Sequence, residues 1–213
     1  MQKNIDYTLY AITDRTWLKE GESLCEAVRK AIEGGASVIQ LREKVLVGDE
    51  LKQLASNVQK VCNQYNVPLI INDDVELAKE IEADGVHIGQ NDMDIQSARK
   101  ILGKDKIIGV TAKTIEQATH AQSNGADYLG SGAVFGSSTK LDAKPMTLDM
   151  FQTICESVEI PVVAIGGIDE TNIEGLRKRK MAGFAVVSAI FAKDDIKAAT
   201  HKLREVAEDI LQN

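Results

Sequence analysis

Short apolar runs recur along the chain about every 25 residues and alternate with segments of helical period. In the last such segment, Ile196, Ala199, Leu203, Val206 and Ile210 form one apolar stripe with charged residues opposite, which predicts an amphipathic helix. Brief runs rich in Val and Ile are typical of parallel strands covered on both faces. We therefore predict eight strands alternating with helices, at Tyr7–Thr13, Ser37–Leu41, Pro68–Asn72, Gly85–Ile88, Ile107–Thr111, Tyr128–Gly132, Pro161–Ile165 and Phe184–Ala189.

Glycine-containing stops precede several of these runs, and glycine is the residue that most often ends a helix. They stand at Gly34–Gly35, Asp84–Gly85, Asn124–Ala126 and Ala182–Gly183, and we expect each to lead from a helix into a short turn. Eight such units in 213 residues fit an α/β protein with a single-domain (β/α)8 TIM barrel. The main competitor, a flavodoxin-like sheet, needs only about five strands. No linker divides residues 1–213, so we expect one domain.

Net charge and cysteine content indicate which partners and which cellular location to expect. With 25 basic and 32 acidic residues the net charge is −7, which disfavours nonspecific binding to nucleic acid or an anionic membrane. Cys25, Cys62 and Cys155 lack paired spacing and fall in apolar-periodic segments, so we expect reduced structural thiols and a cytoplasmic protein. There is no apolar signal core and no long uncharged apolar run, so we expect no membrane partner. The sequence leaves open whether the chain forms a homo-oligomer.

In a TIM barrel the active site lies at the carboxyl ends of the strands, so the polar residues there are the candidates. The two-residue period of the second strand places Gln40, Arg42 and Lys44 on one face and Ile39 and Leu41 on the other. Two unpaired cations at a barrel mouth would cost several kcal/mol of desolvation, on the order of the penalty for any buried ion, unless an anionic ligand met them. The alternative is that Arg42 and Lys44 pair with neighbouring acids at the rim.

Carboxylates follow the third and fourth strands. Asp73 and Asp74 come directly after one strand, and Asp92 follows the next. A few hard carboxylate oxygens, with waters left in place, are how Mg2+ is usually held beside a diphosphate. Helix capping is the alternative for one of Asp73 and Asp74, and also for Asp92. His87 lies within a strand, where a packed, hydrogen-bonded histidine is the expected role.

Two further segments have the composition of phosphate-binding loops. Gly130–Lys140 is dense in glycine and hydroxyl residues and ends in a lysine, although a plain flexible loop is an alternative. Gly166 and Gly167 after the seventh strand, and Val187 and Ser188 at the eighth, would offer backbone N–H groups at the usual phosphate cup of the barrel. That cup alone names no substrate.

The ordered set of motifs from Tyr10 to Ile190 resembles the thiamin phosphate synthase family. The stretches are YAITDR, GGASVIQLREK, INDDVELA, ADGVHIGQNDM, IIGVTAKT, the STK of the sixth loop and VVAIGGI. The resemblance implies an enzyme that couples 4-amino-5-hydroxymethyl-2-methylpyrimidine diphosphate with 4-methyl-5-(2-phosphoethyl)thiazole. It implies thiamin phosphate and diphosphate as products, small phosphorylated molecules as the partners and Mg2+ as the cofactor.

The resemblance also implies roles for individual residues. Asp73 and Asp92 would be the metal ligands, and Arg42, Lys44 and Lys140 would act on the leaving diphosphate. The pyrimidine diphosphate would meet Gln40, Leu41, Arg42, Glu43, Lys44, Asn72, Thr111 and Lys140, with Thr111 standing where the family usually has serine. The thiazole phosphate would meet Ser137, Ser138, Thr139, Gly167, Val187 and Ser188.

The sixth loop departs from the family's usual GPVFPT, because Ala133 replaces a proline and Gly136–Ser137 replaces Pro-Thr. Loss of two prolines raises the ordering cost of the loop. Rival interpretations are a thiazole tautomerase, a noncatalytic regulator on the same barrel and an unrelated phosphate-binding isomerase. The tautomerase uses a histidine near the sixth strand, whereas histidines occur here only at positions 87, 120 and 201. The intact polar set argues against the regulator. The isomerase fits the seventh and eighth strands but leaves Asp73 with Asp92 without a purpose.

Overall fold

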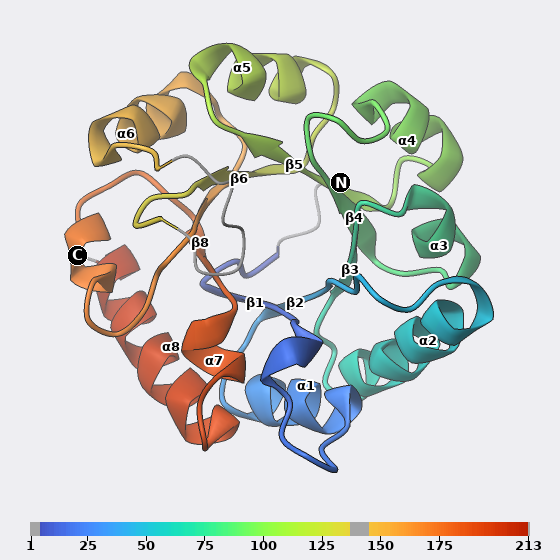
Figure 1. Ribbon diagram of the computed structural model, residues 1–213. Helices are drawn as coiled ribbons and strands as arrows, with labels where there is room; N and C mark the ends of the chain where they lie inside the picture. The colour runs from blue at the N-terminus through green and yellow to red at the C-terminus, as the bar shows by residue number, and fades with distance from the viewer. Residues whose placement is uncertain (1–4, 137–144, 213) are drawn as a thin grey trace.

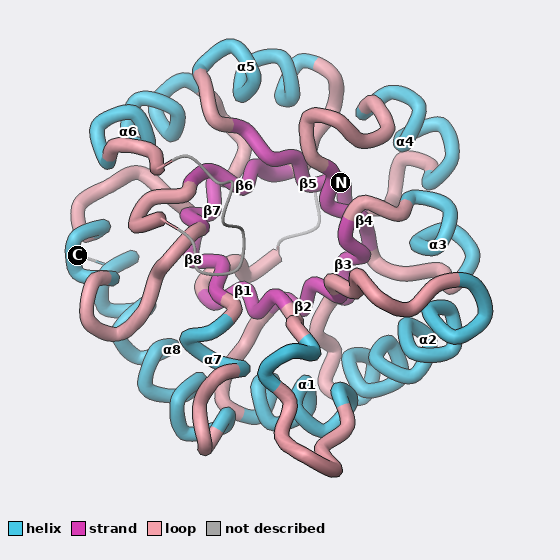
Figure 2. The backbone as a smooth tube through the Cα atoms, viewed as in Figure 1, coloured by secondary structure: helices cyan, strands magenta, loops and turns pink. Residues whose placement is uncertain are grey.

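The computed structural model describes residues 5–136 and 145–212. Eight parallel strands form a closed barrel in chain order, and the last strand pairs with the first, so the predicted TIM barrel is confirmed. Figure 1 and Figure 2 show the ring of strands enclosed by helices. The strands are β1 (Leu9–Ile12), β2 (Val38–Leu41), β3 (Leu69–Asn72), β4 (Gly85–Ile88), β5 (Ile107–Ala112), β6 (Tyr128–Gly132), β7 (Val162–Ile165) and β8 (Gly183–Val186).

Helices follow the strands and cover the outside of the barrel. Within the described residues they are α1 (Leu24–Glu33), α2 (Gly48–Gln64), α3 (Val75–Glu80), α4 (Ile95–Leu102), α5 (Ile115–Ser123), α6 (Leu148–Ser157), α7 (Ser188–Phe191) and α8 (Ile196–Gln212). Two 3-10 turns, η1 (Arg15–Trp17) and η2 (Ile173–Leu176), lie after β1 and β7. No helix within residues 5–136 and 145–212 combines the length and the apolarity that a membrane span requires.

Two predicted elements were wrong in detail. The segment between β7 and β8 contains only η2 in place of a full helix, and the buried apolar residues of η2 are Ile173 and Leu176, one turn apart. The eighth strand ends at Val186, and Ser188 already begins α7. The carboxyl end of the eighth unit is therefore a helix start, and the first-turn N–H groups there lack partners within the helix.

The two-residue period of the strands separates two apolar clusters. The larger lies between strands and helices and includes Ile39 and Leu41 of β2. The smaller fills the barrel and includes Tyr10, Ile70 and Tyr128. Odd and even positions of each strand thus face different cores. Polar residues at the inward-facing positions therefore point into the barrel.

The glycines that precede the strands have two different structural roles. Gly34 caps α1, and Gly125 adopts a φ of +92° after α5, as expected for helix ends. Gly85 and Gly183, in contrast, are the first residues of their strands. A Cβ at Gly85 would lie 2.2 Å from the Ile107 carbonyl oxygen, so close strand approach requires the glycine there.

Candidate active site

The end of β2 divides its side chains as predicted. Ile39 and Leu41 are buried in the outer core, whereas Gln40 faces the barrel, where its Nε2 donates a 2.7 Å hydrogen bond to the hydroxyl of Tyr10. Gln40 is 3% exposed, so its amide needs such a partner. The side chain of Leu41 points away from the inside of the barrel and toward the helices. Any substrate contact from this residue would therefore come through its backbone.

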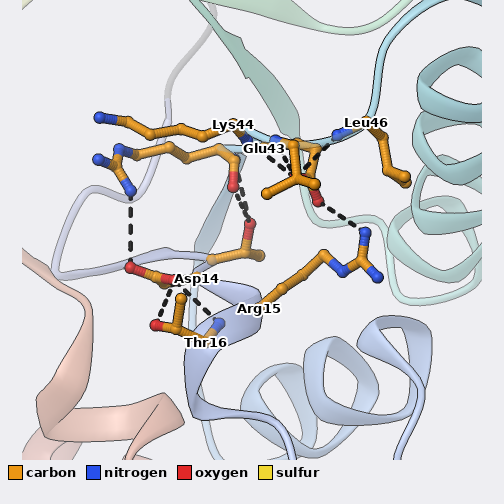
Figure 3. A network of polar contacts seen from close by, with 9 residues as sticks. Asp14, Arg15, Thr16, Glu43, Lys44 and Leu46 are labelled. Carbon is orange, nitrogen blue, oxygen red and sulfur yellow. Dashed lines mark hydrogen bonds and ion pairs between the residues drawn. The ribbon is translucent and has the colours of Figure 1, made fainter.

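Arg42 is held against the end of β1. Its guanidinium lies 3.6 Å from the carboxylate of Asp14, and its backbone N–H donates to Thr13 Oγ1 at 3.0 Å (Figure 3). The guanidinium side chain is 10% exposed, so the pair is shielded from water more than a surface pair would be. Arg42 therefore forms an ion pair with a neighbouring acid, as the alternative interpretation expects. The pair also fixes the position of a cation at the mouth, and Asp14 is a site neighbour that the sequence did not single out.

Glu43 organises the loop that follows β2. Its carboxylate accepts hydrogen bonds from the backbone N–H groups of Lys44, Val45 and Leu46 at 2.9, 2.7 and 3.3 Å. Arg15 reaches it at 3.2 Å, and the carboxylate side chain is only 3% exposed. Burial raises the pKa of Glu43, but these hydrogen bonds outweigh burial and leave the pKa below its ordinary value. The Glu43 carboxylate faces its own loop. Lys44 is exposed, and its side chain extends away from this carboxylate in Figure 3.

The carboxylates after β3 have different roles. Asp74 is the N-cap of α3, where it accepts from the Leu77 N–H at 2.8 Å, so the capping alternative holds for this residue. Asp73 has a φ of +64°, and its N–H donates to the His87 carbonyl at 2.8 Å. Asn72 Nδ2 donates to Asp73 Oδ2 at 2.6 Å. The backbone turn and the amide of Asn72 therefore hold the Asp73 carboxylate at the strand end.

Asp92 is not a helix cap. Asp94 caps α4 by accepting from the Ser97 N–H at 3.0 Å, whereas Asp92 Oδ2 accepts from the Gly89 N–H at 2.6 Å. Asp73 and Asp92 thus follow the neighbouring strands β3 and β4, where the amide of Asn72 donates to the Asp73 carboxylate and the Gly89 N–H donates to the Asp92 carboxylate. Two carboxylates at neighbouring strand ends fit Mg2+, which keeps waters and takes oxygen from a substrate phosphate. The described residues contain no cluster of three or more His, Cys, Asp or Glu side chains arranged for a metal.

Behind Thr111, a polar network fills the barrel. His87 Nε2 lies 3.0 Å from Thr111 Oγ1, and His87 Nδ1 lies 3.0 Å from the hydroxyl of Tyr128. That hydroxyl is 2.7 Å from the hydroxyl of Tyr10. His87 is a buried, hydrogen-bonded histidine, as predicted, but its contact with Thr111 was not foreseen. Burial raises the pKa of both tyrosines, so the phenols keep their protons.

The glycines after β7 hold the start of the sixth loop. Gly166 has a φ of +102° and Gly167 a φ of +65°, and the Phe135 N–H donates to the Gly166 carbonyl at 3.0 Å. A Cβ on Gly167 would lie 2.6 Å from the Phe135 carbonyl oxygen. These glycines therefore let the backbone of the sixth loop lie directly on the end of β7. Val187 and Ser188 stand at the start of α7, directly after the neighbouring strand β8.

Four predicted residues, Ser137, Ser138, Thr139 and Lys140, lie outside the described residues. The structure otherwise brings the predicted positions to the carboxyl ends of neighbouring strands. They are Arg42 after β2, Asn72 and Asp73 at β3, Asp92 after β4, Thr111 on β5, Gly167 after β7, and Val187 and Ser188 after β8.

Fold and site together define a TIM barrel with a polar carboxyl-end mouth, the arrangement used by enzymes of this fold. The family model for thiamine monophosphate synthase matches residues 9–190, and the chain belongs to that family. It is an enzyme of thiamine biosynthesis and a transferase.

Similar proteins agree over nearly the whole chain. A thiamine-phosphate synthase of Clostridium tetani is 46% identical over 201 residues, covering 94% of this chain and 96% of the relative. One from Ruminiclostridium cellulolyticum is 48% identical over 206 residues, covering 97% and 98%. The solved structure of a thiamine phosphate pyrophosphorylase from Pyrococcus furiosus is 38% identical, covers 97% of this chain and 98% of its own, and superposes with a TM-score of 0.89.

Proposed function

We propose that this enzyme couples 4-amino-5-hydroxymethyl-2-methylpyrimidine diphosphate with 4-methyl-5-(2-phosphoethyl)thiazole, with Mg2+ assistance, and releases diphosphate and thiamin phosphate. The observation that carries the proposal is the row of polar groups at successive strand ends. Arg42 at β2, Asp73 at β3 and Asp92 at β4 stand side by side in the order of the strands. Cation and carboxylates at one mouth suit a metal-bound diphosphate.

In this mechanism the bond between the pyrimidine methylene and the diphosphate breaks first. The electron-rich ring stabilises the resulting carbocation, the thiazole nitrogen then attacks it, and no protein nucleophile takes part. Arg42, Lys44 and Lys140 stabilise the charge that grows on the leaving diphosphate. Because the ion pair with Asp14 already holds Arg42, this cation needs little reorganisation as the bond breaks.

Asp73 and Asp92 would hold the metal ion, which when bound neutralises charge on the diphosphate oxygens. Asn72 supports the geometry by fixing Asp73 Oδ2 at 2.6 Å, and the Gly89 N–H does the same for Asp92. Gln40 and Thr111 would meet the pyrimidine ring, since both lie on strands that line the interior. Alignment of two reactants can contribute about 7 to 11 kcal/mol, which suits a site built mainly for positioning.

The thiazole phosphate would bind at the other side of the mouth. Gly167 and the N–H groups at Val187 and Ser188 stand on neighbouring units, and a short helix begins at Ser188. Free first-turn N–H groups attract a phosphate. Ser137, Ser138 and Thr139 would complete this contact from the sixth loop, whose first residues lie on Gly166 and Gly167.

The proposed partners are these small phosphorylated molecules, and we place the reaction in the cytoplasm. The cysteines support this location, because Cys25, Cys62 and Cys155 are free thiols. Burial raises the pKa of Cys62 and of Cys155 to about 12, which keeps both thiols unreactive in the core.

Incubation of the purified protein with both substrates tests the proposal. Thiamin phosphate and diphosphate should form together in equal amounts, as measured by mass spectrometry and a diphosphate assay, and chelation of Mg2+ should stop the reaction. The control is the same mixture without the thiazole phosphate. Product formation that survives complete chelation would remove the metal from the proposal, and no thiamin phosphate under any condition would overturn the activity.

A further inference from the structure

An unbroken chain of hydrogen bonds crosses the barrel interior from β2 to β5. It runs from the amide of Gln40 through the hydroxyls of Tyr10 and Tyr128 and the ring of His87 to the hydroxyl of Thr111. The successive distances are 2.7, 2.7, 3.0 and 3.0 Å. We call these five residues the relay. Its two ends are residues proposed to meet the pyrimidine, and its three inner members have no role in the mechanism above.

The chain has a direction, because each hydroxyl has only one hydrogen to donate. Gln40 Nε2 donates to Tyr10, so the hydrogen of Tyr10 goes to Tyr128. Tyr128 then donates to His87 Nδ1, which must carry no proton. The remaining ring proton sits on Nε2 and is donated to Thr111 Oγ1. Thr111 is left with its own hydrogen to offer, and Gln40 is left with its amide oxygen.

The barrel makes room for the relay with small residues. Gly109 is paired with Tyr128 in the strand register, and a Cβ there would lie 2.1 Å from Tyr128 Cζ. A Cβ on Gly130 would lie 3.0 Å from His87 Cε1. Tyr10 and Tyr128 are each 1% exposed, so their hydroxyls must find partners inside the barrel. The phenols stay protonated because burial raises the pKa of both.

We propose that Tyr10, Tyr128 and His87 are positioning residues that set the hydrogen-bond polarity of the pyrimidine site, with an acceptor at Gln40 and a donor at Thr111. An aminopyrimidine edge carries the complementary pair, an amino donor beside a ring-nitrogen acceptor. The 4-oxo counterpart carries the opposite pair, an N–H beside a carbonyl. The relay therefore selects the amino compound and rejects the oxo compound. This inference rests on the proposed function.

The tautomer of His87 is the direct readout, and it requires no substrate. In 15N-labelled protein the shifts of the two ring nitrogens distinguish the tautomers, and we expect a neutral ring with the proton on Nε2. Tyr128→Phe cuts the chain at its centre and should redistribute the proton between the nitrogens. A wild-type ring with its proton on Nδ1, a doubly protonated ring or an unchanged spectrum in Tyr128→Phe would overturn the relay.

Tyr7→Phe is the matched control. The Tyr7 ring packs on Tyr128 with centroids 4.9 Å apart, but its hydroxyl is not a member of the relay. This variant also loses one tyrosine hydroxyl from the inside of the barrel, and it should leave the His87 tautomer as in wild type. If Tyr128→Phe does not fold, Tyr10→Phe cuts the chain one link earlier and should have the same effect.

Binding of the amino and the 4-oxo pyrimidine diphosphates, measured by calorimetry with Mg2+ present, tests selectivity. Wild type and Tyr7→Phe should prefer the amino compound by about 100-fold or more. Tyr128→Phe should lose about tenfold of that preference, since a buried hydrogen bond of the chain no longer enforces polarity. A folded Tyr128→Phe with full preference would overturn the selection role.

The two proposals fail in different ways. A wild-type protein that makes thiamin phosphate but carries its His87 proton on Nδ1 overturns the relay alone. A wild-type protein that binds neither pyrimidine compound and forms no thiamin phosphate overturns the proposed function, whichever tautomer His87 has.

Discussion

Aspartates that look alike in the sequence have separate roles at the mouth of this barrel. Asp74 and Asp94 cap helices, whereas Asp73 and Asp92 follow strand ends, where they accept from the Asn72 amide and the Gly89 N–H. The positions differ by one residue at Asp73 and Asp74 and by two at Asp92 and Asp94, and a cap must stand directly before the first turn of a helix. The position of each aspartate relative to the first helical turn therefore decides whether it caps the helix.

Asp92→Asn should raise the Mg2+ concentration needed for half-maximal activity by at least about tenfold, because a neutral amide attracts the ion less than a carboxylate. Thermal stability should stay near wild type, since the asparagine oxygen can still accept from Gly89. Asp94→Asn is the control, with the same loss of charge at a position where asparagine also caps a helix. Equal Mg2+ titrations for Asp92→Asn and wild type would remove Asp92 from the metal site.

Gly167→Ala should destabilise the protein more than Gly48→Ala does. Both glycines have positive φ, +65° and +57°, which costs a residue with a Cβ about 1–2 kcal/mol. At Gly167 the new Cβ also meets the Phe135 carbonyl oxygen at 2.6 Å, whereas at Gly48 nothing lies within 4 Å. We expect a further loss of about 1–3 kcal/mol at Gly167 in denaturant unfolding. Equal losses would show that the sixth loop moves aside freely.

At the scale of elements, the loop from β2 to α2 is folded around one buried carboxylate. Glu43 satisfies three successive N–H groups and is clamped by Arg15 from η1, so two neighbouring loops are joined at the mouth. The family resemblance implies that Glu43 meets the pyrimidine diphosphate. Only the backbone path, which turns back on the side chain, shows the structural role.

This loop should loosen in acid. The folded-state pKa of Glu43 lies below the ordinary 4.5, so its contribution is complete above that value and is lost as the pH falls through the lowered folded-state pKa. Amide exchange should show protection at Lys44, Val45 and Leu46 falling over this range.

Glu43→Gln should lower that protection about tenfold at neutral pH and remove its acid dependence, because an amide oxygen replaces only part of the carboxylate's acceptor capacity. The control is Glu20→Gln on the exposed part of the loop after η1. Protection in Glu43→Gln that still falls in acid would assign the effect to another group.

For the whole molecule, much of the fold follows from local pattern. The apolar runs located all eight strands, and alternation along β2 predicted that Gln40 faces inward while Leu41 faces the helices. The contacts between Tyr10, Tyr128 and His87 could not be predicted, since they depend on the register of β1, β4 and β6 around a closed ring. The short η2 also escaped prediction, because a pair of apolar residues one turn apart fits a longer helix equally well.

Closure of that ring depends on Gly183. A Cβ there would lie 1.7 Å from the Tyr7 carbonyl oxygen, on the backbone of the segment that leads into β1. Gly183→Ala should therefore destabilise the barrel by about 1–3 kcal/mol in denaturant unfolding. Gly175→Ala is the control, because its nearest atom is Phe135 Cζ at 3.2 Å, on a ring that can turn away. A Gly183→Ala protein as stable as Gly175→Ala would show that the segment before β1 can move away from β8 at little cost.

The pairing of β1 with β8 also governs how the chain must be made. A nascent chain that has not yet produced β8 leaves β1 and β7 with unpaired backbone groups, and such edges invite pairing with other chains. The first strand to leave the ribosome is thus among the last to be fully paired. Premature termination before residue 183 should yield aggregating fragments in place of a smaller working barrel.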